Sequence, residues 1–248
     1  MYYILRVVAM LTMTIDHIGV TVYPDMQLLR GIGRIAYPLY VYCAVCGWDK
    51  THDKLRYILR LCGLAVLSEP LFDIMMYTDI FNNPHIMESQ NVIFGLALSV
   101  FGLAVQDRIL AQTEWSYVKK GFAGVLSWGV ICGVCLYGNV DYFVITPVLA
   151  LLYRYWKPWA AALGYTGLMA VLCLTDNTVQ MPAWMCAFGL VSVILIFFDK
   201  NEEIEIDAGF KKFWTIFYPA HLAAILMPEL IATVFIITGK LHQLLTTI

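Results

Sequence analysis

Long apolar stretches alternate with short polar connections along almost the whole chain. A membrane-spanning helix needs about 20 mostly apolar residues, and this length separates the predicted spans from the connections. Nine stretches are predicted to be transmembrane helices, and they cover residues 4–22, 32–48, 56–77, 91–106, 119–137, 142–156, 158–174, 182–198 and 213–238. Several are short, so we expect them to tilt or to lie inside the bundle. The pattern predicts an all-α polytopic membrane protein with about nine helices in one bundle.

The composition agrees with this pattern. Of the 248 residues, 60% are apolar and only 14% are charged, whereas soluble domains have about a quarter of their residues charged. No flexible linker or low-complexity tract interrupts the apolar stretches, so residues 1–248 are predicted to form a single transmembrane domain. The first stretch lacks a small-x-small cleavage site and is expected to be retained as a span. The formal net charge of −2 gives no reason to expect a nucleic-acid partner.

The distribution of lysine and arginine predicts the orientation, because cytoplasmic connections are rich in these residues. With the N-terminus inside, the inner connections contain Lys50, Lys54, Arg56, Lys119, Lys120, Lys157, Lys200, Lys211 and Lys212. The outer connections YTDIFNNPHIMESQ, GNVD and TDNTVQM contain no lysine or arginine. We therefore predict an N-inside, C-outside, multi-pass protein of the cytoplasmic (inner) membrane.

The cysteines include two C-x-x-C pairs, Cys43/Cys46 and Cys132/Cys135, and both pairs lie in apolar runs. A zinc or redox site would need polar partners and a loop setting, which neither pair has. The four cysteines are interpreted as packing residues. Neither a metal site nor a disulfide framework is expected.

Ionisable residues inside the predicted spans are the strongest candidates for function, because a charge in hydrocarbon is costly. At a rise of ~1.5 Å per residue, His17 lies ~20 Å from the cytoplasmic end of its span. Glu69 reaches a similar depth, Arg34 lies within about a turn of it, and His221 is closer to the middle of its span. The sequence predicts one layer of polar side chains to which four helices contribute.

Arg6 and His17 are eleven residues apart, which is close to three helical turns. The two side chains therefore share one face, with the arginine at the cytoplasmic end and the histidine ~16 Å deeper. This arrangement suits a substrate that enters from the cytoplasm by a charged head and extends a thin tail inward.

Asp16 is adjacent to His17, and adjacent helical residues point about 100° apart. We therefore predict that Asp16 pairs with Arg34 or Arg30. His17 is then expected to be oriented by another helix, with Glu69 or Tyr218 as the candidates.

Structural roles would explain the same residues. His17 and His221 could be hydrogen-bonding struts between helices, and the Glu69-Pro70 pair could mark a helix kink. Arg30 and Arg34 could be interfacial anchors.

Four blocks of sequence together resemble the TraX family. They are MLTMTIDHIG, RGIGRIAYPLYVY, the T-x-x-x-x-x-Y-x-x-R run from Thr51 to Arg60, and FYPAHL near the C-terminus. The founding member of that family is an inner-membrane pilin N-acetylase. The spacing of Arg6 and His17 also resembles the signature of the wider transmembrane acyltransferase superfamily, whose members take acetyl-CoA from the cytoplasm and acylate an acceptor on the opposite side.

The resemblance implies an acetyl-CoA-dependent acetyltransferase with a histidine base, for which His17 is the choice. The polar residues expected around that base are Asp16, Glu69 and His221. A group must also face the carbonyl oxygen, and Arg34, Tyr37 or His221 could serve, with Arg30 and Tyr218 in the same layer. The phosphates of coenzyme A would need a basic site, which Arg6, Lys54, Arg56 and Arg60 could form, although positive-inside topology alone would also place them there.

The acceptor stays open between a peptide, a sugar and a small molecule, modified at an amine or a hydroxyl, and a homo-oligomer is compatible with the sequence. Two other classes of function also stay open. A small transporter or channel could use the buried polar layer as a proton or substrate path. A non-catalytic assembly factor for a surface appendage could use the same charges to hold its helices together.

Overall fold

The computed structural model describes residues 2–76, 89–175, 182–199 and 207–246, and these residues are almost entirely helical. The helices are α1 (Tyr2–Thr21), α2 (Gln27–Gly33), α3 (Ala36–Lys50), α4 (Lys54–Met76), α5 (Val92–Leu110), α6 (Tyr117–Tyr137), α7 (Ile145–Tyr155), α8 (Pro158–Thr175), the 3-10 helix η1 (Ala183–Phe188), α9 (Gly189–Phe197) and α10 (Ala208–Thr246). Within the described residues there is no β-strand, and a single bridge joins Gln90 to Val140. The predicted all-α class is confirmed.

Each of the nine predicted spans contains a helix, but four helices of the described residues are both long and apolar enough to cross a membrane. They lie at Tyr3–Thr21, Val92–Leu110, Tyr117–Tyr137 and Pro158–Thr175, and Trp184–Phe197 forms a shorter apolar helix. The helices α3 and α7 have only 15 and 11 residues, and α4 is long but carries charged side chains. The structure thus supports a helical membrane protein without supporting nine full crossings.

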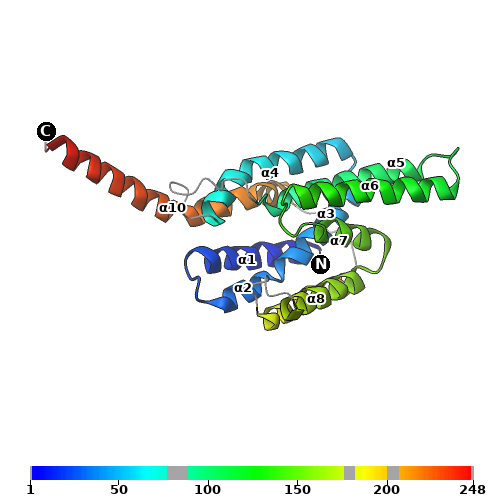
Figure 1. Ribbon diagram of the computed structural model, residues 1–248, viewed down its shortest axis with the longest axis horizontal. Coiled ribbons are helices and arrows are strands. Elements are labelled where there is room, and N and C mark those ends of the chain that lie inside the picture. Colours follow the sequence, from blue (N-terminus) through cyan, green and yellow to red (C-terminus); the bar gives the residue numbers. More distant parts are fainter. Residues whose placement is uncertain (1, 77–88, 176–181, 200–206, 247–248) are drawn as a thin grey trace.

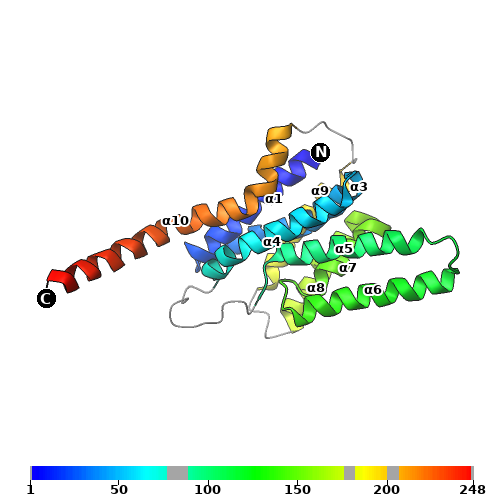
Figure 2. The ribbon, with the colours of Figure 1, turned by 90° about the horizontal axis from the view of Figure 1, so that it is seen from above.

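The central helix of the bundle is α3, and 11 of its 15 residues are buried. It packs against α1, α5, α7 and α9. By contrast, α6 packs mainly on α5 and exposes a broad apolar face, as expected of a helix in contact with lipid. Figure 1 shows α5 and α6 side by side at one end of the molecule, while the last part of α10 extends away from the other helices at the opposite end. In Figure 2, α10 is visibly bent, and it contains Pro219 and Pro228.

The short helix α2 was not predicted, and it folds back against α1. Gly33 allows this close approach, since a Cβ atom at that position would overlap the side chain of Asp16. On its other side α2 rests on η1, where Gly31 lies against the ring of Phe188. This packing brings Arg30 and Arg34 to the C-terminal half of α1, where both contact Asp16.

The connection between α6 and α7 has a strained backbone. Asn139, Tyr142 and Phe143 have positive φ angles of 47°, 61° and 42°, which are costly for residues with a side chain. Backbone hydrogen bonds to Gln90 hold the connection, with Gln90 N donating to Asn139 O at 2.9 Å and Asp141 N donating to Gln90 O at 2.8 Å. The result is that the Tyr142 ring stacks on the ring of Tyr37 at a centroid distance of 3.7 Å.

Candidate functional site

Two buried histidines meet where α1 packs against α10. His17 Nδ1 lies 2.8 Å from His221 Nε2, and the two rings are nearly parallel, with an angle of 6° between their planes. His17 is only 6% exposed and His221 only 7%. The sequence placed both residues in one polar layer, and the structure brings them into direct contact.

The hydrogen bonds of His221 define which nitrogen atoms carry protons in the neutral pair. His221 Nδ1 lies 2.9 Å from the carbonyl oxygen of Phe217, and a carbonyl can only accept, so Nδ1 donates. His221 Nε2 is then an acceptor, and His17 Nδ1 must donate to it. In the neutral His17 ring this leaves Nε2 with its lone pair, and Nε2 has no hydrogen-bond partner among the described residues.

The residue that orients His17 is therefore His221, and the prediction of Glu69 or Tyr218 for this role needs correction. Oε2 of Glu69 instead accepts from the backbone N of Asn91 at 3.0 Å and from the Asn91 side-chain amide. Because Asn91 caps the start of α5, the carboxylate of Glu69 fastens α4 to α5. Tyr218 contacts both histidines edge-on, with ring centroids 6.1 Å from His17 and 5.4 Å from His221.

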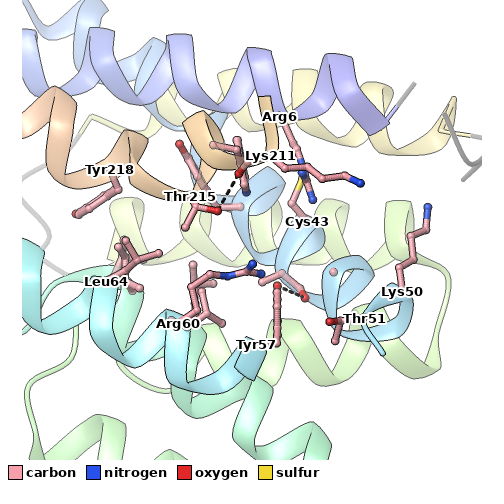
Figure 3. Close-up of a pocket in the computed structure, with 18 of the residues that line it drawn as sticks. Arg6, Cys43, Lys50, Thr51, Tyr57, Arg60, Leu64, Lys211, Thr215 and Tyr218 are labelled. Carbon is pink, nitrogen blue, oxygen red and sulfur yellow. Dashed lines mark hydrogen bonds between the residues drawn. The ribbon is translucent and has the colours of Figure 1, made fainter. Parts of the chain in front are cut away.

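A cavity of about 620 Å³ lies between α1, α3, α4, α5 and α10. Four cationic residues line it at the end of the bundle where α1, α4 and α10 begin and α3 ends, which we call the basic end; they are Arg6, Lys50, Arg60 and Lys211. Further along the helices the lining is largely apolar and includes Met13, Leu64, Val92, Ile93, Leu96 and Tyr218. Figure 3 shows Lys50 and Tyr218 on opposite sides of the cavity, with Arg6 and Arg60 between them.

Tyr218 connects this cavity to the histidine pair, because it lines the cavity and also contacts both imidazole rings. Its side chain is 6% exposed, and its hydroxyl has no hydrogen-bond partner among the described residues. His17 and His221 do not themselves line the cavity. The Tyr218 ring is the contact between the two parts of the site.

Of the four basic residues predicted to bind a donor, two line the cavity and two do not. Arg6 and Arg60 line the cavity, whereas Lys54 and Arg56 do not. The Lys54 ammonium donates to the carbonyl oxygen of Trp48 and lies 4.4 Å from the centre of its ring. The Arg56 side chain is 84% exposed and pairs with Asp53 at 3.2 Å.

Two cationic lining residues, Lys50 and Lys211, were not among the predicted donor-binding residues. Both lie in connections that the sequence assigns to the same side of the membrane as Arg6, and this shared side was the signal that could have identified them. Arg6 also lies over the ring of Trp214, with 5.0 Å between the guanidinium carbon and the ring centre.

A cluster of ion pairs, formed by Asp16, Arg30 and Arg34, lies at the other end of α1. Asp16 Oδ1 is 3.3 Å from Arg30 Nη1 and 3.2 Å from Arg34 Nη2. Both partners predicted as alternatives for Asp16 are thus engaged at once. Arg34 also donates from Nη1 to the Tyr142 hydroxyl at 3.2 Å, so the cluster joins α1 and α2 to the α6–α7 connection.

Tyr37 is committed to packing and to one hydrogen bond. Its hydroxyl lies 2.9 Å from Thr146 Oγ1, its ring stacks on Tyr142, and its side chain is fully buried. Among the described residues, no group of histidine, cysteine, aspartate and glutamate side chains is arranged to hold a metal ion.

The fold and the site define a helical membrane protein with a basic-ended internal cavity next to a buried histidine pair. Comparison with known families identifies the chain, since the family model described as TraX protein matches residues 2–228. The chain belongs to the TraX family.

Two curated relatives show how far the similarity extends. The chain is 23% identical over 232 residues to the probable fimbrial assembly protein FimC, serogroup H1, of Dichelobacter nodosus, and the match covers 88% of this chain and 91% of the relative. It is 37% identical over 78 residues to the uncharacterized protein RP591 of Rickettsia prowazekii (strain Madrid E), over 31% of each chain. No solved structure matches the chain.

Proposed function

We propose that this protein is an integral-membrane acyltransferase that moves an acetyl group from cytoplasmic acetyl-CoA to an amine or hydroxyl acceptor at the outer side of the membrane. The observation that carries the proposal is the cavity, which extends from a cationic end to Tyr218 beside the histidine pair. The membership of the protein in the TraX family supports the same activity. The proposal includes the predicted nine-span, N-inside topology in the cytoplasmic membrane, which places the basic end of the cavity in the cytoplasm.

The cavity suits a donor with an anionic head and a thin, mostly apolar arm. Arginine and lysine side chains bind phosphate groups through charge-assisted hydrogen bonds, and Arg6, Lys50, Arg60 and Lys211 supply four of them. Its volume of about 620 Å³ falls within the usual range of small-molecule sites, about 300–1,000 Å³. Acyl-CoA, bound here, would supply the acyl group as a thioester.

His17 is the general base in this proposal. Its Nε2 carries the lone pair in the neutral tautomer, so it can take a proton from the attacking amine or hydroxyl. His221 is a positioning residue, because its acceptor nitrogen holds the proton of His17 on Nδ1. The Phe217 carbonyl in turn fixes the tautomer of His221.

Tyr218 is proposed to stabilise the negative charge that develops on the carbonyl oxygen. The other candidates for this role, Arg34, Tyr37 and His221, already have partners in the described structure, and both ring nitrogens of His221 are engaged by His17 and the Phe217 carbonyl. Arg34 is bound to Asp16 and Tyr142, and the Tyr37 hydroxyl is bound to Thr146. The Tyr218 hydroxyl is unpartnered among the described residues, and the Tyr218 ring lies edge-on to the ring of His17.

The test is acetyl-CoA binding and turnover by the purified protein in detergent, first with water as acceptor and then with peptide, sugar and amine acceptors. His17→Gln should bind the donor normally and lose turnover by about 10²–10⁴-fold. The control is His52→Gln, because His52 is exposed and is not one of the residues that line the cavity. Tyr218→Phe should also bind the donor and lose about 10²–10³-fold in kcat.

Donor binding is tested separately with Arg60→Ala, which removes a cation from the cavity. The matched control is Arg56→Ala four residues earlier on α4, where the side chain is exposed and does not line the cavity. We expect the first variant to weaken acetyl-CoA binding and the second to leave it unchanged. The proposal fails if the folded wild-type protein does not bind acetyl-CoA.

A second candidate is a non-catalytic assembly factor, and the description of the Dichelobacter nodosus relative as a fimbrial assembly protein favours it. In that case His17→Gln should support appendage assembly in cells as well as the wild type, provided the variant is inserted and folded. An acyltransferase whose product is needed for assembly would lose this function with the same substitution.

A further inference from the structure

Two cysteines from different helices come together at the end of the bundle opposite the basic end. Cys173 lies in the last turn of α8 and Cys186 lies in η1, 13 positions later. Their sulfur atoms are 3.7 Å apart. Cys186 is buried, whereas Cys173 is partly exposed. The C-x-x-C motifs did not indicate this pair, because neither Cys173 nor Cys186 belongs to one.

The cysteine pair lies next to Arg34 and at the helix that supports α2. Cys186 and Arg34 line the same small crevice, together with residues of α8. The helix η1 also supports α2, since the Phe188 ring lies at 3.0 Å from the place of a Cβ atom on Gly31. A bond between the two sulfur atoms would fasten η1 to α8 and thereby fix the support behind the ion-pair cluster.

We propose that Cys173 and Cys186 form a disulfide, and that this pair is a redox modification site of the protein. The inference does not rest on acyl transfer, and it takes only the N-inside topology from the proposed function. The sulfur atoms need to approach by less than 2 Å to reach the bonded distance of about 2.05 Å. In the proposed topology this end of the bundle faces the outer side of the membrane, where disulfides form and persist.

The reaction is thiol–disulfide exchange with a small or protein disulfide as oxidant. Cys173 is the more exposed thiol, so its thiolate attacks a sulfur atom of the oxidant, forms a mixed disulfide and expels one thiolate. The Cys186 thiolate then attacks the Cys173 sulfur, forms the Cys173–Cys186 bond and expels the second thiolate. The two protons of the cysteine thiols end on the two leaving thiolates, and the oxidant is reduced to two thiols.

The disulfide should stabilise the fold, because it closes a short loop in the unfolded chain. For loops of this size the effect on a protein of this length corresponds to an increase in Tm of roughly 5–10 °C. The reduced protein should fold without it, since η1 and α8 already pack against each other.

The test uses the full-length wild-type protein in detergent, treated with oxidised glutathione or with dithiothreitol, then alkylated, digested and analysed by mass spectrometry. We expect a linked Cys173–Cys186 peptide after oxidation, its loss after reduction, and the higher Tm in the oxidised sample. Cys62→Ser is the control, because Cys62 is exposed on α4 and its removal should leave the linked peptide and the Tm increase in place.

Cys173→Ser should abolish both the linked peptide and the difference in Tm between the two treatments. The inference is overturned if oxidised wild-type protein is alkylated at both cysteines and yields no linked peptide. It is equally overturned if the linked peptide forms only after the protein has been unfolded. Both results come from the wild-type chain, so they hold even if a serine variant does not fold.

Discussion

Removing the carboxylate of Asp16 should destabilise the protein strongly. The substitution Asp16→Asn keeps the shape of the side chain and takes away the charge that faces Arg30 and Arg34. The side chains of Asp16 and Arg34 are only 11% and 13% exposed, and that of Arg30 is 33% exposed. After the substitution, the Arg34 guanidinium keeps the Tyr142 hydroxyl and the Arg30 carbonyl oxygen as partners but has no counter-ion within the cluster.

The magnitude follows from the burial of the pair. Breaking a buried ion pair by removing one partner costs about 3–5 kcal/mol, because an uncompensated charge is left in a poorly solvated site. The amide oxygen of asparagine still accepts one hydrogen bond, and Arg30 reaches solvent, so the lower figure of about 3 kcal/mol is expected. In a protein of this length that corresponds to a decrease in Tm of roughly 10 °C.

The assay is thermal unfolding of the purified protein in one detergent, and the chain offers a matched control. Asp53 Oδ2 lies 3.2 Å from Arg56 Nε, the same distance as between Asp16 and Arg34, but both side chains are exposed. Asp53→Asn should therefore cost no more than about 1 kcal/mol. Equal Tm values for Asp16→Asn and Asp53→Asn would refute the reasoning, because burial would then have no effect on the energy of the pair.

Three further substitutions test other parts of the fold by thermal unfolding. Gly33→Ala should prevent or severely impair folding, because its Cβ atom would overlap Asp16. Gly129→Ala, with nothing within 4 Å of the new atom, should be neutral or stabilising. Equal effects of the two substitutions would contradict this prediction. Burial raises the pKa of Asp141 to about 6 from an ordinary value of 3.8, so the folded protein holds a proton that the unfolded chain releases. Stability should therefore fall as pH rises from about 4 to about 6. Asp141→Asn should remove that fall and be more stable than wild type above pH 6, and an unchanged pH profile would contradict the prediction. Asn91→Ala should lower the Tm, because it removes the cap of α5 and a hydrogen bond to a buried carboxylate on α4; an unchanged Tm would contradict it.

The positions of the helices could be predicted from the sequence because an apolar run of this length has few alternatives to a helix in a membrane. The number of crossings could not, since length and depth depend on neighbouring helices. The seven-residue helix α2 was missed for a related reason. Such a short helix has no stable periodic pattern of its own, and it forms because Gly33 can approach α1 closely.

The partners of Asp16 were predictable, whereas those of the basic residues at the other end were only partly so. Helix geometry excludes a side-chain contact between neighbours such as Asp16 and His17, and it left the two arginines of the next segment as candidates. For Lys54 and Arg56 the correct end of the helix could be predicted from the sequence. The helix face could not, because a solvated helix end carries no apolar stripe to define one.

The contact between His17 and His221 could not be predicted from the sequence. Depth along a helix places His17 and His221 in one polar layer, but a hydrogen bond also requires that the two helix faces meet. The meeting of the faces is set by the packing of α10 against α1 and α4, over a separation of 204 positions in the chain. Once the contact exists, the carbonyl of Phe217 determines the tautomers of both histidines. It accepts the proton on Nδ1 of His221, and the lone pair of His17 is thereby left on Nε2. A variant that keeps an imidazole at position 17 but loses His221, such as His221→Leu, should therefore retain donor binding and shift the pH dependence of turnover. A variant that loses turnover with an unchanged pH profile would indicate that His221 is only a packing residue.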